Sequence, residues 1–210
     1  MKKYILTIDQ GTTSTRAILF DHKANTIGIY QMEFTQICPK SGYVEHNADE
    51  IYQTVLECIK NVIINASIEP EEIDSIAITN QRETTVAFGF DGHPLANAIC
   101  WQSRQSQKIC DDLIARGYED MIYQKTGLHI NPYFSASKIR YLIDNNQNIK
   151  DLYDAGKVLF GTMDTYILYR LTNGASFKTD ATNASRTMLY NIHTPVSYTH
   201  LRAHETLSDL

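Results

Sequence analysis

A short polar segment near the start of the chain carries residue types suited to binding phosphate. It reads DQGTTSTR, and the residues in it that could bind phosphate or metal are an acid, a glycine, three of its four hydroxyl residues and an arginine: Asp9, Gly11, Thr12, Thr13, Ser14 and Arg16. A glycine lets the backbone approach a ligand closely, successive N–H groups in a tight turn can surround an anion, and a guanidinium matches phosphate oxygens. Asp9 suits a hydrated Mg²⁺ ion, which prefers oxygen ligands and retains water. From the local residues alone, a plain polar hairpin turn remains the more common alternative.

A second polar group follows an apolar run in ITNQRETTVAF, where Arg82 and Glu83 are adjacent. Arginine only donates hydrogen bonds and an ionised glutamate only accepts them, so together they can satisfy neighbouring hydroxyls of a polyol. The single tryptophan, Trp101, and Tyr133 could add an apolar wall and one more hydroxyl. The plainer alternatives are an exposed Arg–Glu pair and ordinary core packing of the tryptophan.

Three β-like segments and one helix position the first polar segment. The pattern predicts strands at 4–9, 15–21 and 25–34, joined by short polar turns as an antiparallel meander. Residues 47–66 then change to helical periodicity, with a single apolar stripe. Asn47 followed by Glu50 suits the start of this helix.

Strands and helices alternate in the rest of the chain. We expect a buried strand at 74–81, a strand at 84–92 that ends in an Asp-Gly turn, and a strand at 157–162. Helices are expected at 106–117, 135–146 and 163–174. This order predicts an α/β domain whose mixed sheet is antiparallel at one end and parallel at the other.

Composition narrows the class of protein. The net charge is −5 and no Lys/Arg stripe is present, which argues against nucleic acid as a partner. No run of about 18 apolar residues exists, so membrane insertion is not expected, and the apolar stretch after the first residues is too short for a signal peptide. Four cysteines lack a C-x-x-C pair. Free thiols in a reducing cytoplasm fit this pattern.

Seven motifs taken together resemble the FGGY carbohydrate kinases. In order they are DQGTTSTR, GYVEHNADEIY, ITNQRETT, AICWQSR, PYFSASK, LFGTMDTYILYRLT and TDATNASRTMLYNI. The resemblance covers about Lys3 to Thr194 and is to the N-terminal part of those members that act on glycerol. It implies a ribonuclease-H-like, actin-like ATPase fold with two domains and a substrate cleft between them. It also implies that ATP, with Mg²⁺, phosphorylates glycerol to sn-glycerol 3-phosphate.

The resemblance also assigns roles to residues. The turn at Gly11, Thr12, Thr13 and Ser14 would contact nucleotide phosphates, with Arg16 on ADP and Asp9 near the hydrated metal. Arg82, Glu83 and Tyr133 would bind glycerol hydroxyls, and Trp101 would pack on its carbons. Alternatives are a kinase of the same family acting on xylulose or gluconate, a non-catalytic binding module, and an actin-like ATPase of the chaperone or filament kind.

Several features depart from the family pattern. Gln105 stands where a second arginine is common, and Asn131 replaces an aspartate. Residues 195–210 match nothing expected, so we interpret 1–194 as an incomplete N-terminal kinase domain followed by a foreign tail, with the second kinase domain absent. The general base, an aspartate in the family, would lie beyond this chain, so no catalytic residue is assigned. We therefore expect the chain to be inactive alone; its full-length parent could be a homo-oligomer.

Overall fold

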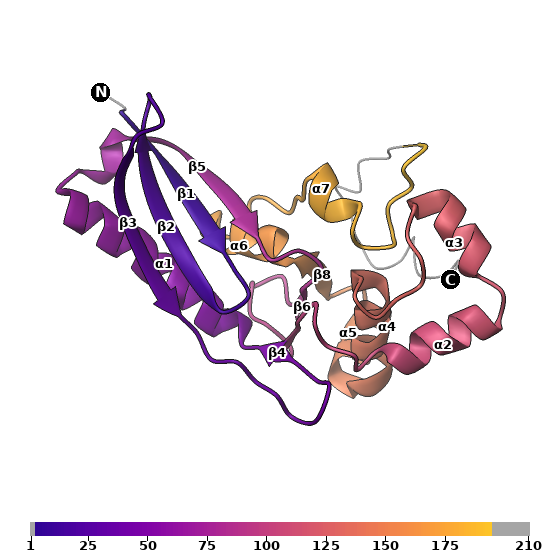
Figure 1. Cartoon of the computed structure of the whole chain (residues 1–210). Coiled ribbons are helices and arrows are strands. Elements are labelled where there is room, and N and C mark those ends of the chain that lie inside the picture. Colours follow the sequence, from indigo (N-terminus) through magenta and orange to yellow (C-terminus); the bar gives the residue numbers. More distant parts are fainter. Residues whose placement is uncertain (1–2, 195–210) are drawn as a thin grey trace. The chain divides into compact units, whose positions relative to one another are not determined.

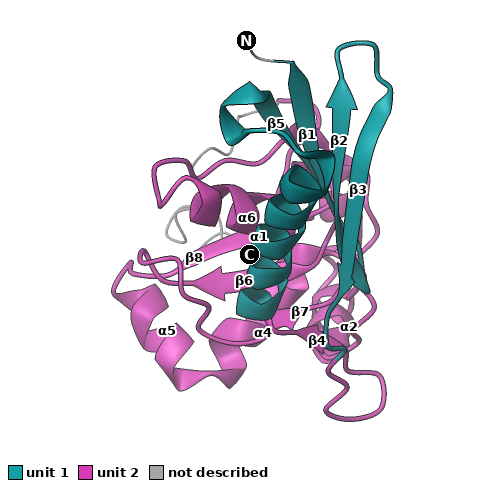
Figure 2. Ribbon diagram, turned by 90° about the vertical axis from the view of Figure 1, so that its left-hand side faces the viewer, with its two compact units in different colours: residues 1–36, 48–81 teal, residues 37–47, 82–210 magenta. Residues whose placement is uncertain are grey.

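The computed structural model describes residues 3–194. Within these residues the chain forms two compact units, shown in different colours in Figure 2. Unit 1 comprises the residues up to 36 together with 48–81, and unit 2 comprises 37–47 together with the residues from 82 onward. The predicted foreign tail, 195–210, lies outside the described residues.

Unit 1 contains a mixed four-stranded sheet in the order β3-β2-β1-β5. Its strands are β1 (Tyr4–Gln10), β2 (Ser14–Asp21), β3 (Thr26–Glu33) and β5 (Ile73–Asn80). Strands β1, β2 and β3 form the predicted antiparallel meander, and β5 pairs with β1 in parallel. The predicted mixed sheet, antiparallel at one end and parallel at the other, is confirmed (Figure 1).

Helix α1 (Ala48–Ala66) packs along one face of this sheet and confirms the helix expected at 47–66 (Figure 2). Cys58 and Val62 of its apolar stripe are fully buried against Leu6 and Leu19 of the sheet. Gly28 allows this close packing, because a Cβ there would lie 3.3 Å from a methyl group of Val62. A short 3₁₀ turn, η1 (Pro70–Glu72), then leads into β5.

The expectation of a buried strand at 74–81 is wrong in one respect. Strand β5 exists, but it is an edge strand of this sheet. Most of its residues are exposed, including Ile76, which is 51% exposed. An apolar run predicts that a segment is a strand, yet it does not distinguish a central strand from one at an edge.

Unit 2 is built on a second sheet, which is antiparallel throughout and was not foreseen as separate. Its strand order is β4-β7-β6-β8, with bounds Glu45–His46, Ala98–Ile99, Thr85–Phe88 and Leu159–Thr162. All residues of β6 and β8 are buried. The strands predicted within 84–92 and 157–162 are therefore confirmed, with shorter bounds.

Unit 2 also contains six helices within the described residues. They are α2 (Gln107–Ala115), α3 (Glu119–Thr126), α4 (Ser135–Asn145), α5 (Gln147–Asp154), α6 (Met163–Leu171) and α7 (Ala181–Ala184). Of these, α4 and α6 pack on the sheet. The three helices predicted in this part of the chain correspond to α2, α4 and α6, whereas α3, α5 and α7 were not predicted. Helix α6 is followed by Asn173 and Gly174, both in the left-handed region, as its Asn-Gly ending suggested.

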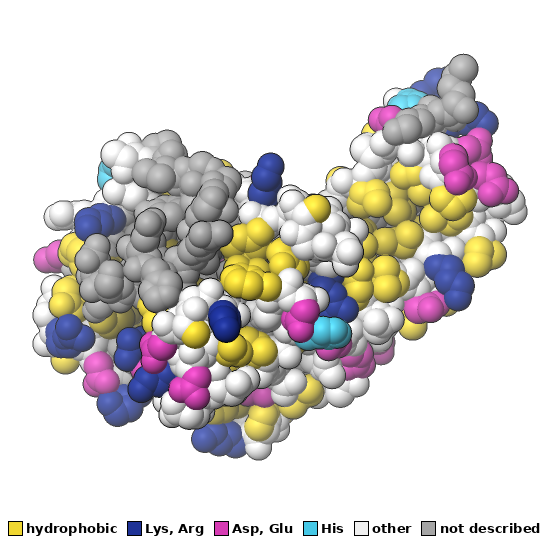
Figure 3. All heavy atoms as spheres, turned by 180° about the vertical axis from the view of Figure 1, so that it is seen from behind, with side chains coloured by type: hydrophobic (Ala, Val, Ile, Leu, Met, Phe, Trp, Pro, Cys, Tyr) yellow, Lys and Arg dark blue, Asp and Glu magenta, His cyan; other side chains and the backbone are white. Residues whose placement is uncertain are grey.

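Both kinds of charged side chain occur on the face of the molecule drawn in Figure 3. On this face, Lys and Arg side chains are interspersed with Asp and Glu. Among the described residues no helix is both long and apolar enough to cross a membrane. Three cysteines are buried and Cys38 is exposed, and all four are free thiols.

Candidate functional site

The predicted phosphate turn lies in unit 1, where residues 11–13 connect β1 to β2. The amide of Gly11 donates to the carbonyl oxygen of Ser14 at 2.9 Å. A Cβ on Gly11 would lie 3.2 Å from the same oxygen, which is a tight contact. The glycine therefore allows a narrow turn in which the backbone is accessible to a ligand.

Three successive carbonyl oxygens of this turn accept hydrogen bonds from groups elsewhere in unit 1. Gly11 O accepts from Gln10 Nε2 (2.6 Å) and Gln81 Nε2 (3.1 Å), Thr12 O from Gln36 Nε2 (3.1 Å), and Thr13 O from Phe34 N (3.3 Å). These contacts engage oxygens that would repel an anion. They also hold the turn in one conformation before any ligand arrives.

A chain of polar contacts beside the turn joins the predicted metal and phosphate residues. Arg16 Nη1 lies 3.6 Å from Asp9 Oδ2, and Arg16 Nε donates to Gln31 Oε1 at 3.2 Å. The amide nitrogen of Gln31 donates in turn to Ser14 Oγ at 2.9 Å. Gln31 was not predicted, although it is the direct cross-strand partner of Arg16. Aligning the meander strand by strand would have found it.

The surroundings of Asp9 fit a hydrated magnesium ion. Its side chain is 39% exposed, and no group of three or more potential metal-ligating side chains occurs within residues 3–194. A single accessible carboxylate suits Mg²⁺, which keeps several waters and takes its remaining ligands from substrate phosphates.

The predicted polyol residues lie in unit 2, where Glu83 has an unusual backbone. Its φ is +65°, in the left-handed region, and its side chain is only 3% exposed. The carbonyl oxygen of Glu83 accepts from Thr85 Oγ1 at 3.1 Å and from Ser135 Oγ at 3.3 Å. A non-glycine residue in this region costs about 1–3 kcal/mol and persists only where its surroundings fix it, often at functional sites.

The ion-pair partner of Glu83 is Arg186, which was not predicted. Arg186 Nε lies 2.6 Å from Glu83 Oε1. The guanidinium also lies 5.6 Å from the ring centre of Tyr133 and 4.9 Å from that of Phe134. The motif TDATNASRTMLYNI contained Arg186, but nothing in the sequence shows that it meets a residue so far away along the chain.

Two further predicted residues pack beside this pair. The rings of Trp101 and Tyr133 lie 5.5 Å apart at 59°. The amide of Trp101 donates to Thr84 Oγ1 at 3.2 Å, which ties it to the residue after Glu83. The structure thus brings Glu83, Trp101 and Tyr133 together in unit 2. Arg82, by contrast, is exposed, and Glu83 forms its ion pair with Arg186 instead.

The two departures from the family pattern are accommodated locally. Asn131 Oδ1 accepts from the amide of Tyr133 at 2.9 Å, as an aspartate oxygen could. Gln105 is buried, and its Oε1 accepts from Ser103 Oγ at 3.0 Å. An uncharged residue therefore fits at position 105 without an ionic partner.

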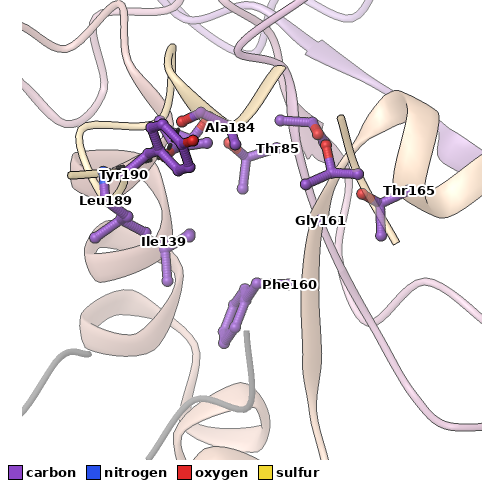
Figure 4. A pocket seen from close by; sticks show the side chains of 12 residues that line it. Thr85, Ile139, Phe160, Gly161, Thr165, Ala184, Leu189 and Tyr190 are labelled. Atoms are coloured by element: carbon purple, nitrogen blue, oxygen red, sulfur yellow. Dashed lines mark hydrogen bonds between the residues drawn. The ribbon is translucent and has the colours of Figure 1, made fainter. Parts of the chain in front are cut away.

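A separate cavity lies within unit 2 (Figure 4), with a volume of about 20 Å³. Thr85 and Ser135, which bind the Glu83 carbonyl, contribute to its lining, together with Ile139 and Phe160. This volume suits roughly one water molecule. None of the predicted substrate residues lines the cavity.

Solved structures similar to this chain include carbohydrate kinases. The chain matches a glycerol kinase of Plasmodium falciparum, solved with ADP, with a TM-score of 0.85 and 35% identity, over 92% of this chain and 39% of that one. It matches a gluconate kinase of Lactobacillus acidophilus with a TM-score of 0.81 and 27% identity, over 92% and 38%. The predicted actin-like ATPase fold is confirmed.

The family model described as "FGGY family of carbohydrate kinases, N-terminal domain" matches residues 4–197. The chain belongs to the FGGY family. It is 51% identical over 195 residues to a glycerol kinase of Shewanella frigidimarina and 53% identical over 193 residues to one of Enterococcus casseliflavus. These matches cover 92% and 91% of this chain, which spans 39% and 38% of the relatives' length.

Proposed function

We propose that the protein containing this chain is an ATP-dependent kinase that converts glycerol to sn-glycerol 3-phosphate. The observation that carries this proposal is the buried Glu83 carboxylate, held by Arg186 beside the rings of Tyr133 and Trp101. Glycerol is small, and each of its hydroxyls both donates and accepts. A fixed charged acceptor next to aromatic rings suits such a ligand better than a broad groove would.

In this proposal each residue of the polyol site has a separate task. Glu83 accepts a hydrogen bond from one hydroxyl, Arg82 donates to another, and the phenol of Tyr133 can do either. The ring of Trp101 packs against the carbons. Leaving one buried polar group without its partner costs about 1–3 kcal/mol, which penalises ligands whose hydroxyls are placed differently.

The turn in unit 1 would bind the nucleotide phosphates. The hydroxyls of Thr12, Thr13 and Ser14 would donate to phosphate oxygens, Gly11 would let the phosphates approach the backbone closely, and Arg16 would balance their charge. Asp9 would hold Mg²⁺ through water. When bound, the metal neutralises charge on the phosphate oxygens.

The reaction forms a bond between a glycerol oxygen and the γ-phosphorus of ATP and breaks the bond from that phosphorus to the bridging oxygen, releasing ADP. The hydroxyl proton passes to a base, and we assign no residue of this chain to that task. Positioning and charge neutralisation supply most of the catalysis in such transfers. Both are tasks that the residues named above can perform.

The pattern of similarity favours glycerol over a larger sugar. Among the solved structures, identity is 35% to the Plasmodium falciparum glycerol kinase, 27% to the gluconate kinase and 26% to a xylulose kinase of Lactobacillus acidophilus, and it is 51–53% to the two bacterial glycerol kinases named above. The free thiols support a reducing, cytoplasmic location.

A coupled assay on the complete protein that contains these residues tests the proposal. With ATP and Mg²⁺, glycerol should give a higher kcat/KM than xylulose or gluconate. A higher value for either sugar would overturn the assignment to glycerol, and no turnover with any of the three would overturn the kinase assignment.

A further inference from the structure

Lys138 is a fully buried lysine in the first turns of helix α4. Its side chain runs back toward the start of the helix, where Nζ donates to the carbonyl oxygens of Tyr133 and Phe134, the second at 3.3 Å. The amine therefore ties the backbone of the predicted substrate residue Tyr133 to the helix that follows it.

Burial of this amine requires an explanation beyond packing. Lysine is almost never fully buried unless it is paired, and its hydrogen-bond partners within the described residues are these two carbonyl oxygens rather than a carboxylate. Two acceptors match the two N–H bonds of a neutral amine. Burial lowers the pKa of Lys138 to about 7, against the opposing influence of Cys100, Glu83 and Cys110.

Two further side chains at the start of α4, those of Ser135 and Ser137, contact other segments of unit 2. Ser135 Oγ donates to the carbonyl oxygen of Glu83 at 3.3 Å. Ser137 Oγ lies 2.9 Å from Ser106 Oγ, at the start of α2. The first turn of α4 thus fixes the backbones of two predicted substrate residues, Glu83 and Tyr133, and Lys138 makes the contact to Tyr133.

We propose that Lys138 is a positioning residue for the polyol, which it serves by holding the Tyr133 backbone so that the tyrosine ring stays against Trp101. The role in polyol binding rests on the proposed function, whereas the effect on the two rings does not. A methionine could fill much the same volume without burying an amine. The carbonyl contacts, rather than the volume, are therefore the reason for a lysine here.

The first test measures the position of the rings directly. Trp101 is the only tryptophan of the 210-residue chain and reports on its contact with Tyr133. In Lys138→Met we expect a red-shifted Trp101 emission and stronger acrylamide quenching, by about twofold. The matched control is Ile143→Val, a buried substitution on the same helix that also lowers stability but leaves the carbonyl contacts intact.

Unchanged emission and quenching in Lys138→Met, or an equal change in Ile143→Val, would overturn the proposal. If circular dichroism shows that Lys138→Met does not fold, Lys138→Gln replaces it. Lys138→Gln retains a shorter donor and should also red-shift the Trp101 emission and increase acrylamide quenching. Emission and quenching equal to those of wild type would again overturn the proposal.

The second test uses kinetics of the complete protein. Lys138→Met should raise the glycerol KM about tenfold, the equivalent of one lost hydrogen bond, and leave the ATP KM within about twofold. In a Tyr133→Ala background the same substitution should add no further rise, because Lys138 acts through Tyr133. Equal rises in both KM values, or full additivity, would contradict this role. Absence of glycerol turnover would reject the proposed function while leaving the fluorescence result to decide the positioning of Tyr133.

Discussion

Arg186 Nε lies 2.6 Å from Oε1 of Glu83, although the two residues are 103 positions apart in the chain. The Glu83 side chain is 3% exposed and that of Arg186 is 30% exposed, so the pair is largely removed from water. Removing one partner of such a pair leaves a buried charge without compensation. The pair joins two sequence motifs at the predicted polyol site, and its glutamate is the residue with the left-handed backbone.

Stability measurements should reveal this coupling. We expect Arg186→Met to lower the free energy of unfolding in urea by about 3 kcal/mol, because Glu83 stays buried and loses its partner. The double variant Glu83→Gln/Arg186→Met should recover at least about 1 kcal/mol of this loss, since no charge is then stranded. A double variant as unstable as the sum of the two single variants would show that the pair is not coupled.

Arg82 should affect binding without affecting stability. Its side chain is exposed, so Arg82→Ala should leave the urea midpoint of the complete protein unchanged. The glycerol KM should rise about tenfold or more with the loss of a charged donor, and the ATP KM should change far less. Arg116→Ala, which removes another exposed arginine, is the control and should change neither KM. Equal effects of Arg82→Ala on both substrates would refute its assignment to the polyol.

Gln31 should influence the nucleotide side alone. Replacing it with leucine removes the bridge between Ser14 and Arg16. We expect the ATP KM to rise about threefold to tenfold and the glycerol KM to stay constant, as measured in the coupled assay. Thr26→Ala, at the exposed start of the same strand, should behave as wild type. An unchanged ATP KM in Gln31→Leu would show that the contacts among Arg16, Gln31 and Ser14 do not contribute to phosphate binding.

The burial of Lys138 should make stability depend on pH. In the unfolded chain a lysine keeps its proton up to about pH 10.5, but folded Lys138 loses it near pH 7. Between these values the unfolded state binds more protons, so the free energy of unfolding contributed by this group rises with pH, by at most about 1.4 kcal/mol per pH unit.

Comparison of wild type with Lys138→Met isolates this contribution from the other titrating groups. Urea unfolding at several pH values above 7 should give a steeper rise for wild type than for the variant. Parallel curves would mean that Lys138 remains charged when folded.

Local pattern was sufficient to predict much of the fold. The alternation of residues 4–34 predicted the meander, and the apolar stripe of 47–66 predicted α1. The edge position of β5 and the separate second sheet depend on which segments pair over long distances, and the period of a strand does not encode its partners. The short helices α3, α5 and α7 are too brief for a clear helical period.

In the candidate site, too, local patterns were informative, whereas long-range contacts could not be predicted. Residue types and spacing predicted phosphate binding at the turn at Gly11 and polyol binding at Arg82 and Glu83. They did not predict Arg186, because its contact with Glu83 joins residues far apart in the chain. The unusual φ of Glu83 also depends on surroundings that no local motif specifies. Gln31 was also not predicted, but it could have been found from the sequence, because the register of the predicted meander places it opposite Arg16.

A crystal structure of the complete protein with glycerol and a non-hydrolysable ATP analogue tests the central claim most directly. The account predicts glycerol hydroxyls within hydrogen-bond distance of Glu83 and Tyr133, its carbons against Trp101, and the terminal phosphates at the turn of residues 11–14. Glycerol bound without contact to Glu83, or phosphates bound away from that turn, would contradict it.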